Sequence, residues 1–348
     1  MRIALRRIAL VLLSTLLTLA VCEGLLRLVD YPPALFFPWE SDRETAYKFA
    51  PHLHQRMISP QYDVLFETNS LGLRSPEVGI KQGPRVLVLG DSFTCGYGVE
   101  EPETFCGLLR RRLEVDLVNA GIGGWELIHQ LHYVRAHLAE LQPDLVVLVV
   151  YLGNDIIGNL SWESRPGNEL VSRLAPFPEH KPKTPKLKIL HDVWRFQRRV
   201  EARPPAQEWE PAKWALRILE REPGPEVARA CAESGRILRE IQAEVRKTGA
   251  ELLVVFWSER QLVDAAAGER WKARIPDFDS KYDPLKPELY MEELCTGLGI
   301  AHVNLNRALR AADPERFYWR QDSHFNQLGH EFVADQLEPL VRERLESR

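Results

Sequence analysis

The sequence predicts an α/β protein in which one parallel sheet is covered by helices on both faces. Short aliphatic runs without polar alternation recur along the chain, as in strands that are buried on both sides. Segments with the apolar spacing of helices lie between several of these runs, so each strand can return parallel to the previous one. The five predicted strands lie at residues 86–89, 115–118, within 144–155, and at 252–257 and 302–305.

Right-handed crossovers between these strands give a three-layer α/β/α sandwich of flavodoxin-like type with a five-stranded parallel sheet. The clearest predicted helix covers residues 225–247, where Val227, Ile237 and Ile241 recur at helical spacing. Further helices are expected near residues 288–298 and 327–345. Residues that follow parallel strands meet at the carboxyl edge of the sheet, where ligands bind in open α/β folds.

The N-terminus predicts a membrane-spanning helix. Arginines at positions 2, 6 and 7 precede an apolar run over residues 8–21, which continues with two interruptions to Val29. This length is close to the roughly 20 residues that cross a bilayer as a helix. Basic residues before the run place the N-terminus in the cytoplasm and the rest of the chain outside. A signal peptide, or lipoprotein cleavage before Cys22, is the alternative to an uncleaved anchor.

Composition divides the chain into an anchor at residues 1–29, a stalk and irregular cap at 30–83, and a main domain at 84–348. An insertion at residues 159–224 is rich in Pro, Lys, Arg and Trp, and includes the run KPKTPKLK. Its aromatic residues either pack on the core or line a substrate groove. These residues are Trp194, Phe196, Trp209 and Trp214. A second, polar surface excursion is expected at residues 258–286.

Charge and cysteine content exclude several classes of function. A net charge of −4 gives no overall basic footprint for nucleic acid. The five cysteines, at positions 22, 95, 106, 231 and 295, contain no CxxC pair, so neither a metal nor a cofactor is expected. Cys95 and Cys106 are close enough in sequence for a local disulfide, whereas Cys231 and Cys295 read as free thiols.

Three histidines fall on one predicted helix. His129, His132 and His137 have the spacing i, i+3 and i+8, which does not match a usual metal motif. We expect them to be partly exposed helix residues.

Ser92 is the candidate nucleophile, because it follows the first predicted strand and lies two positions after the turn residue Gly90. Taken alone, a serine in this place is more typical of a helix N-cap. Three further segments favour catalysis. They are NAGIGGWE at 119–126, GND at 153–155 and QDSHFNQLGHEF at 321–332. A histidine is the usual base for a serine hydroxyl, and a carboxylate fixes the tautomer of that histidine.

The four blocks, in this order, resemble the SGNH or GDSL hydrolase superfamily over residues 84–345. The resemblance implies that Ser92 is the nucleophile and His324 the base. It also implies an oxyanion hole formed by the amides of Ser92 and Gly124 and the side chain of Asn154. The final block of the family is commonly DxxH, whereas here Asp322 precedes His324 by two residues, so its orienting role departs from the pattern.

Further residues near the blocks receive supporting roles. We expect Asp91 and Asp155 to hold turns through backbone hydrogen bonds, and we assign His330 no catalytic role. The segment FETNSLGLRSPE at 66–77 resembles the lead-in of membrane-anchored bacterial members of the superfamily.

These observations predict a membrane-anchored, extracytoplasmic serine esterase or acyltransferase that forms an acyl-Ser92 intermediate. The expected substrates are O-acyl esters, O-acetyl groups among them, on a surface or exported glycan. A lipid or lysophospholipid ester is the alternative substrate. The alternative class is a non-catalytic glycan-binding or assembly protein on the same fold. The partners expected for this chain are an ester-bearing small molecule or glycan and the membrane. Nucleic acid is not expected as a partner.

Overall fold

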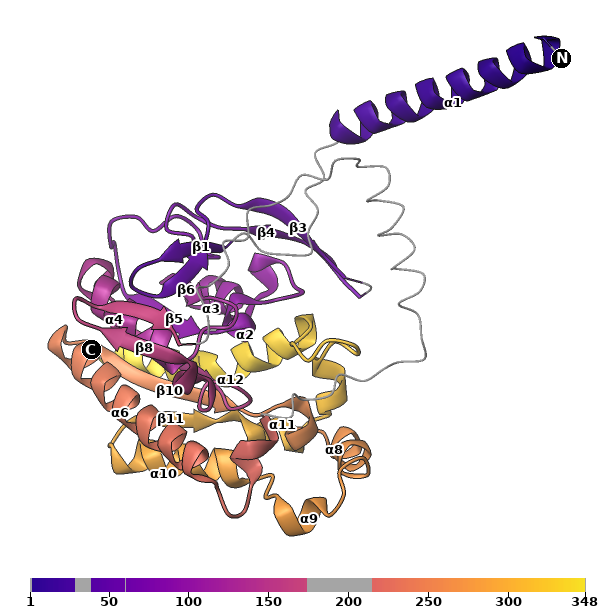
Figure 1. Ribbon diagram of the computed structural model, residues 1–348. Helices are drawn as coiled ribbons and strands as arrows, with labels where there is room; N and C mark the ends of the chain where they lie inside the picture. The colour runs from indigo at the N-terminus through magenta and orange to yellow at the C-terminus, as the bar shows by residue number, and fades with distance from the viewer. Residues whose placement is uncertain (1, 29–38, 60, 174–214, 348) are drawn as a thin grey trace.

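The computed structural model describes residues 2–28, 39–59, 61–173 and 215–347. Its centre is a five-stranded parallel sheet with the strand order β11-β10-β7-β5-β6 (Figure 1). The strands are β5 (Arg85–Gly90), β6 (Asp116–Gly121), β7 (Leu145–Tyr151), β10 (Glu251–Trp257) and β11 (Ala301–Asn304). This order is that of a flavodoxin-like sheet, so the predicted fold class is confirmed.

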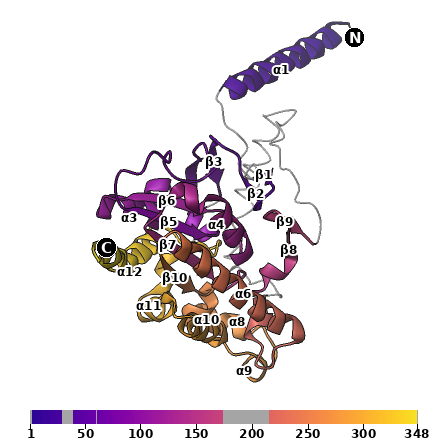
Figure 2. The same ribbon diagram turned by 90° about the vertical axis from the view of Figure 1, so that its left-hand side faces the viewer.

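Helices cover both faces of the sheet, which explains the uninterrupted apolar runs (Figure 2). Every residue of β5 and β7 is buried. One face packs against α4 (Leu127–Leu141), α6 (Pro225–Lys247) and α10 (Lys286–Gly297). The other face packs against α3 (Phe105–Leu113), α11 (Leu305–Ala311) and α12 (Gln327–Glu346). The predicted helix at residues 225–247 coincides with α6.

Residues 39–67 form two antiparallel hairpins, which differs from the irregular cap expected there. The first joins β1 (Trp39–Asp42) to β2 (Ala46–Phe49), and the second joins β3 (His54–Ile58) to β4 (Asp63–Glu67). Each strand has only four or five residues, so alternation is weak in the sequence. The alternation is nevertheless real, since Tyr47 and Phe49 of β2 are buried and their neighbours are half-buried.

The insertion begins with the turn η2 (Gly158–Ser161) and a hairpin of β8 (Trp162–Arg165) and β9 (Glu169–Ser172). This hairpin lies against α4 and corrects the expected exposure of two histidines. His129 is buried beside Trp162, at 4.3 Å between ring centroids. His132 is buried with its Nε2 2.8 Å from Ser164 Oγ. Of the three histidines, His137 alone is partly exposed, as expected.

Other parts of the insertion lie outside the described residues. These are the KPKTPKLK run and the aromatic residues Trp194, Phe196, Trp209 and Trp214. The chain is described again from η3 (Ala215–Leu219). The polar excursion at 258–286 contains three short helices, namely α7 (Arg260–Val263), α8 (Ala265–Lys272) and α9 (Phe278–Lys281).

All five cysteines are free thiols, so Cys95 and Cys106 form no disulfide. Both are buried in apolar surroundings, where they act as small hydrophobic side chains. Among the described residues, no group of three or more His, Cys, Asp or Glu side chains is arranged to hold a metal ion.

The N-terminal helix α1 (Arg2–Leu28) stands apart from the sheet and its helices (Figure 1). Its segment Arg6–Leu25 is long and apolar enough to cross a membrane, a test that a signal sequence also passes.

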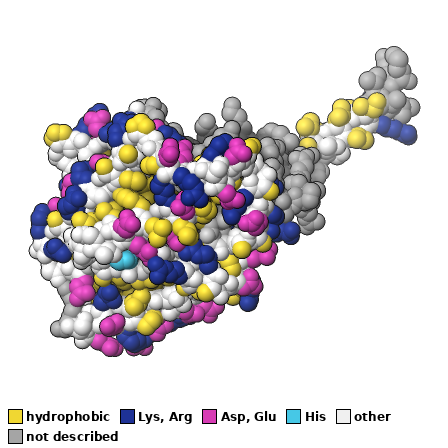
Figure 3. Space-filling model, turned by 90° about the horizontal axis from the view of Figure 1, so that it is seen from below, with side chains coloured by type: hydrophobic (Ala, Val, Ile, Leu, Met, Phe, Trp, Pro, Cys, Tyr) yellow, Lys and Arg dark blue, Asp and Glu magenta, His cyan; other side chains and the backbone are white. Residues whose placement is uncertain are grey.

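The face of the molecule in Figure 3 carries Lys and Arg side chains interspersed with Asp and Glu.

A buried arginine connects the second hairpin to the turn that follows β5. The guanidinium of Arg74 donates to the carbonyls of Leu65 (3.1 Å), Cys95 (3.1 Å) and Val99 (2.5 Å), and also to that of Gly96. The side chain is fully buried and stacks over Phe66 at 4.7 Å. Arg74 therefore satisfies three buried carbonyls, those of Cys95, Gly96 and Val99, and the partly buried carbonyl of Leu65.

We expect Arg74→Met to destabilise the fold by about 3 kcal/mol or more, because each buried carbonyl left unpaired costs about 1 to 3 kcal/mol. Urea unfolding followed by circular dichroism measures this loss. Arg111→Met is the matched control, since Arg111 is exposed and donates to one carbonyl, that of Pro102. Equal stability of the two variants would contradict the structural role of Arg74.

Candidate active site

Ser92 begins the four-residue helix α2 (Ser92–Cys95) directly after β5. The N-cap of this helix is Asp91, whose Oδ1 accepts a hydrogen bond from Phe93 N at 2.9 Å. The structure thus gives the capping role to Asp91, as expected, and leaves the Ser92 hydroxyl available for another partner. Gly90 lets the nucleophile turn pack closely against the end of β5, because a Cβ atom at this position would lie 2.1 Å from Thr94 Oγ1.

His324 is that partner. Its Nε2 lies 2.7 Å from Ser92 Oγ, although 232 positions separate the two residues in the chain. His324 lies in the loop before α12, which is closed by a bridge between Tyr318 and Phe325 and by a 3.0 Å hydrogen bond from Trp319 N to His324 O. With the ring proton on Nδ1, the Nε2 atom accepts from the serine hydroxyl.

Asp322 completes the hydrogen-bonded series despite its short spacing from His324. Its Oδ1 contacts His324 Nδ1 and also accepts from His324 N at 3.0 Å. The backbone bond folds the two residues into a tight turn, which brings the carboxylate to the ring of the residue two positions later. The DxH spacing is therefore compatible with the contact that the commoner DxxH spacing implies.

The two groups shift each other's pKa in opposite directions. Burial by itself lowers the pKa of His324, but the charge and hydrogen bond of Asp322 outweigh burial and raise it above the usual 6.5. Burial by itself raises the pKa of Asp322, but His324 and a hydrogen bond from Tyr62 lower it to about 2. Asp322 is therefore ionised at neutral pH and favours the protonated form of His324.

The three proposed oxyanion donors follow three neighbouring strands. Ser92 follows β5, Gly124 follows β6 and Asn154 follows β7, so all three lie at the carboxyl edge of the sheet. Gly124 has a φ of +78°, a conformation that glycine adopts without strain. Within the described residues, no hydrogen bond occupies the Gly124 amide or the side-chain amide of Asn154.

Two supporting residues fix this edge. Asn119 links the nucleophile turn to the glycine turn, because its Nδ2 donates to Thr94 O at 2.9 Å and its Oδ1 accepts from Gly121 N at 3.0 Å. Asp155 holds the turn after β7 by accepting from Tyr151 N at 2.9 Å, as expected. His330 lies buried in α12, where its Nδ1 accepts from Phe105 N at 3.2 Å, and it takes no part in the site.

Tyr62 and Arg74 contribute to the site from the segment that precedes β5, and sequence reasoning gave them no role. Tyr62 donates from its hydroxyl to Asp322 Oδ2 at 3.0 Å. Arg74 fixes the backbone of the nucleophile turn. Arg74 lies in the segment 66–77, which the sequence analysis singled out without assigning a role to this residue. Tyr62 has no comparable signal.

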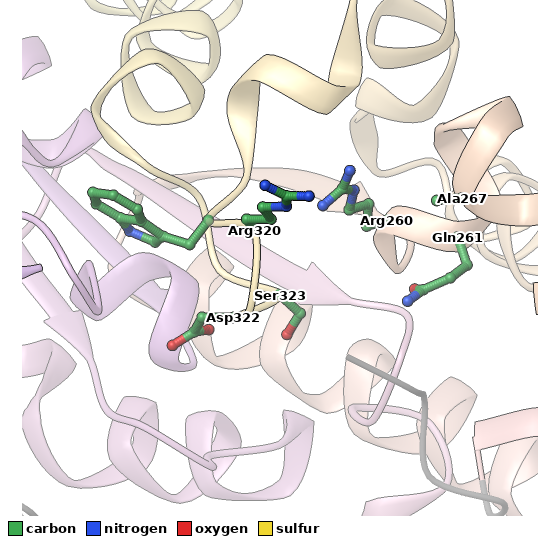
Figure 4. Close-up of a pocket in the computed structure, with 7 residues that line it drawn as sticks. Arg260, Gln261, Ala267, Arg320, Asp322 and Ser323 are labelled. Carbon is green, nitrogen blue, oxygen red and sulfur yellow. The ribbon is translucent and has the colours of Figure 1, made fainter. Parts of the chain in front are cut away.

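A hollow lies next to Asp322, and polar side chains make up most of its lining (Figure 4). Arg260 enters it from α7 and Arg320 from the loop before α12. Arg260 is paired with Asp264 at 3.1 Å, whereas Arg320 is exposed. The lining residues are Arg260, Gln261, Ala267, Trp319, Arg320, Asp322 and Ser323.

A sequence model described as the GDSL-like lipase/acylhydrolase family matches residues 88–332. The chain belongs to this family. Its membership makes the protein a hydrolase enzyme of the GDSL or SGNH type, as the resemblance predicted. The match begins after Tyr62 and Arg74, so both residues lie outside the part of this GDSL hydrolase that the family model covers.

Solved structures with a similar fold include three with related descriptions. The acetyl xylan esterase AlAXEase has 15% identity and a TM-score of 0.43, with 74% of this chain and 99% of that chain covered. The lipase/acylhydrolase from Enterococcus faecalis has 14% identity and a TM-score of 0.43, with 75% of this chain and 96% of that chain covered. The acetylxylan esterase Axe2 from Geobacillus stearothermophilus has 12% identity and a TM-score of 0.41, with 76% of this chain and 95% of that chain covered. A search of curated proteins finds no match.

For the GDSL hydrolase we expect the acid limb of kcat/KM to have its midpoint above pH 6.5, because the reaction needs neutral His324 and the pKa of that residue is raised. Asp322→Asn removes the charge that raises it, so the midpoint moves to lower pH. The rate falls roughly 10³- to 10⁴-fold, as in other triads that lose their carboxylate. A pH profile on p-nitrophenyl acetate measures both effects, and an unmoved acid limb in Asp322→Asn would contradict this coupling.

Asn154→Ala should lower kcat roughly 100- to 1,000-fold and leave KM nearly unchanged, because an oxyanion donor acts in the transition state and not in substrate binding. Ser92→Ala should abolish turnover. Steady-state kinetics on the same ester distinguish the two roles, with thermal unfolding as the control for folding. A rise in KM at constant kcat in Asn154→Ala would show that Asn154 binds substrate instead.

Proposed function

We propose that this GDSL hydrolase is a serine esterase or O-acyltransferase that cleaves O-acyl esters, O-acetyl esters among them, on a surface or exported glycan. The observation that carries the proposal is the 2.7 Å contact between Ser92 Oγ and His324 Nε2, backed by Asp322 on the opposite ring nitrogen. This arrangement matches the roles of nucleophile, base and orienting carboxylate in acyl transfer.

In the proposed reaction, Ser92 Oγ attacks the ester carbonyl while His324 Nε2 takes the hydroxyl proton. The tetrahedral intermediate carries its negative charge on the former carbonyl oxygen, which accepts from the Ser92 amide, the Gly124 amide and Asn154. His324 then returns the proton to the departing alcohol as the carbon–oxygen bond breaks. An acyl-Ser92 ester remains, and water or a sugar hydroxyl attacks its carbonyl while His324 takes the proton of the attacking group. The bond to Ser92 Oγ then breaks, His324 returns the proton to Ser92, and a carboxylic acid or a new sugar ester leaves.

The glycan substrate rests on the resemblance of the chain to GDSL esterases and on the location outside the cytoplasm that helix α1 favours. The hollow beside Asp322 is only water-sized and is not itself a sugar subsite. The alternative substrate is a lipid or lysophospholipid ester, which the apolar helix α1 favours because it would hold the enzyme at a bilayer. In both cases we propose that α1 anchors the chain by a single pass, with residues 30–83 as stalk and cap and residues 84–348 as an extracytoplasmic catalytic domain.

A fluorophosphonate probe should label the wild-type chain at Ser92, because a serine activated by a histidine attacks phosphorus as it attacks a carbonyl. Labelling should be lost in Ser92→Ala and in His324→Ala, and mass spectrometry locates the adduct. A wild-type protein that stays unlabelled would favour the non-catalytic glycan-binding or assembly protein on this fold.

A panel of substrates tests the acyl group and the acceptor. We expect acetate release from an acetylated oligosaccharide to exceed fatty-acid release from lysophosphatidylcholine, with Ser92→Ala as the blank in each assay. The reverse preference would replace the glycan substrate by the lipid ester. Adding an unacetylated oligosaccharide measures transfer, since an acyltransferase moves acetate to the acceptor whereas an esterase releases it to water.

A further inference from the structure

The tip of the β3–β4 hairpin contacts the loop that carries Asp322 and His324. Tyr62 lies at this tip, where its backbone amide donates to Ser59 Oγ at 3.2 Å. Its hydroxyl donates to Asp322 Oδ2 at 3.0 Å, whereas Asp322 Oδ1 serves His324. The two carboxylate oxygens of Asp322 therefore have different partners, one in the site and one in the hairpin.

Two further contacts fix the same pair of segments. Gln61 Oε1 accepts from Gln321 N at 2.8 Å, and the Tyr62 ring lies 5.4 Å from the ring of Trp319. The fit is close, because a Cβ atom at Gly98 would lie 2.6 Å from Trp319 Nε1 and 3.0 Å from the Tyr62 ring. The hairpin tip thus contacts the loop at three positions: the ring of Trp319, the backbone amide of Gln321 and the carboxylate of Asp322.

We propose that Tyr62 is a positioning residue of the catalytic machinery, which holds Asp322 in the orientation that its contact with His324 requires. This inference rests on the proposed function of Ser92 and His324. An aspartate carboxylate can rotate about its last bond, and a contact on Oδ1 alone leaves that rotation open. A donor on Oδ2 from a separate, packed element fixes the plane of the carboxylate and with it the ring of His324.

The same contact changes the charge that His324 experiences. A hydroxyl that donates to Asp322 Oδ2 takes up part of the negative charge of the carboxylate. Removing it leaves a stronger negative charge beside the His324 ring, which favours the protonated imidazole. Among the described residues, Asp91 also acts on His324, whose ring lies beside Ser92 Oγ and the rings of Phe93 and Tyr97. His330 interacts with the charge of His324 too, but burial lowers the pKa of His330 to about 3, so it stays neutral in the range of the acid limb. None of these contacts involves Tyr62 Oη, so the effect of its loss is specific.

The test is Tyr62→Phe, which keeps the ring packing against Trp319 and removes one hydrogen-bond donor. We expect kcat on p-nitrophenyl acetate to fall about 10- to 100-fold, the range for a lost hydrogen bond to a charged group. KM should change little, and the acid limb of kcat/KM should move to higher pH. The rate of fluorophosphonate labelling should fall by the same factor as kcat.

Tyr318→Phe is the matched control. Its ring is buried beside the same loop, and among the described residues its hydroxyl has no hydrogen-bond partner. We expect this variant to keep the wild-type kcat and pH profile. Tyr62→Ala, which also removes the ring, separates packing from hydrogen bonding.

Three results would decide the matter. Wild-type rates and an unmoved acid limb in Tyr62→Phe, with a loss confined to Tyr62→Ala, would show that the ring packs and the hydroxyl does not position Asp322. An equal loss in Tyr318→Phe would show a general effect of removing a buried phenol, and would also overturn the inference. Failure of wild-type protein to take up the fluorophosphonate probe would instead overturn the proposed function, so the two failures are distinguishable.

Discussion

The hydrogen bond between Ser92 and His324 imposes the main constraint on this structure, because it joins two turns that lie 232 positions apart. A hydroxyl and an imidazole must stay within about 3 Å for proton transfer. Each turn is therefore fixed by groups of its own. Asp91 and Arg74 hold the nucleophile turn, and Asp322 and Tyr62 hold the turn of the base. The parallel sheet supplies the common edge on which both turns are built.

Burial around this edge changes the charge state of several acids. Burial raises the pKa of Asp91 to about 6, and it raises the pKa of Glu126 and of Glu259 to about 8. Asp322 differs from these acids because the charge of His324 lowers its pKa, together with hydrogen bonds from His324 Nδ1, His324 N and the Tyr62 hydroxyl. At neutral pH Asp322 and most of Asp91 are therefore ionised, whereas Glu126 and Glu259 favour the neutral form.

Local patterns predict the sheet well, and the four blocks single out Ser92, Asp322 and His324, which the structure places in one hydrogen-bonded series. Uninterrupted aliphatic runs identify β5 and β7, and the turn that follows each run contains a residue of the site. The hairpins were missed because four-residue strands show too little alternation, and His129 was misjudged because its cover comes from β8, remote in sequence. Tyr62 was missed for the same reason: its partner lies 260 positions away, and no local pattern encodes such a pairing.

The hairpin contacts have a consequence for how shorter relatives should be judged. Every motif of the family lies within residues 88–332, yet a phenol and a guanidinium from earlier in the chain reach into that region. A protein trimmed at the family boundary would retain all four diagnostic blocks and lose two of the groups that support them. In this chain the four blocks alone therefore omit two groups that contact the site, and the segment before the family match is part of the packed structure rather than a spacer.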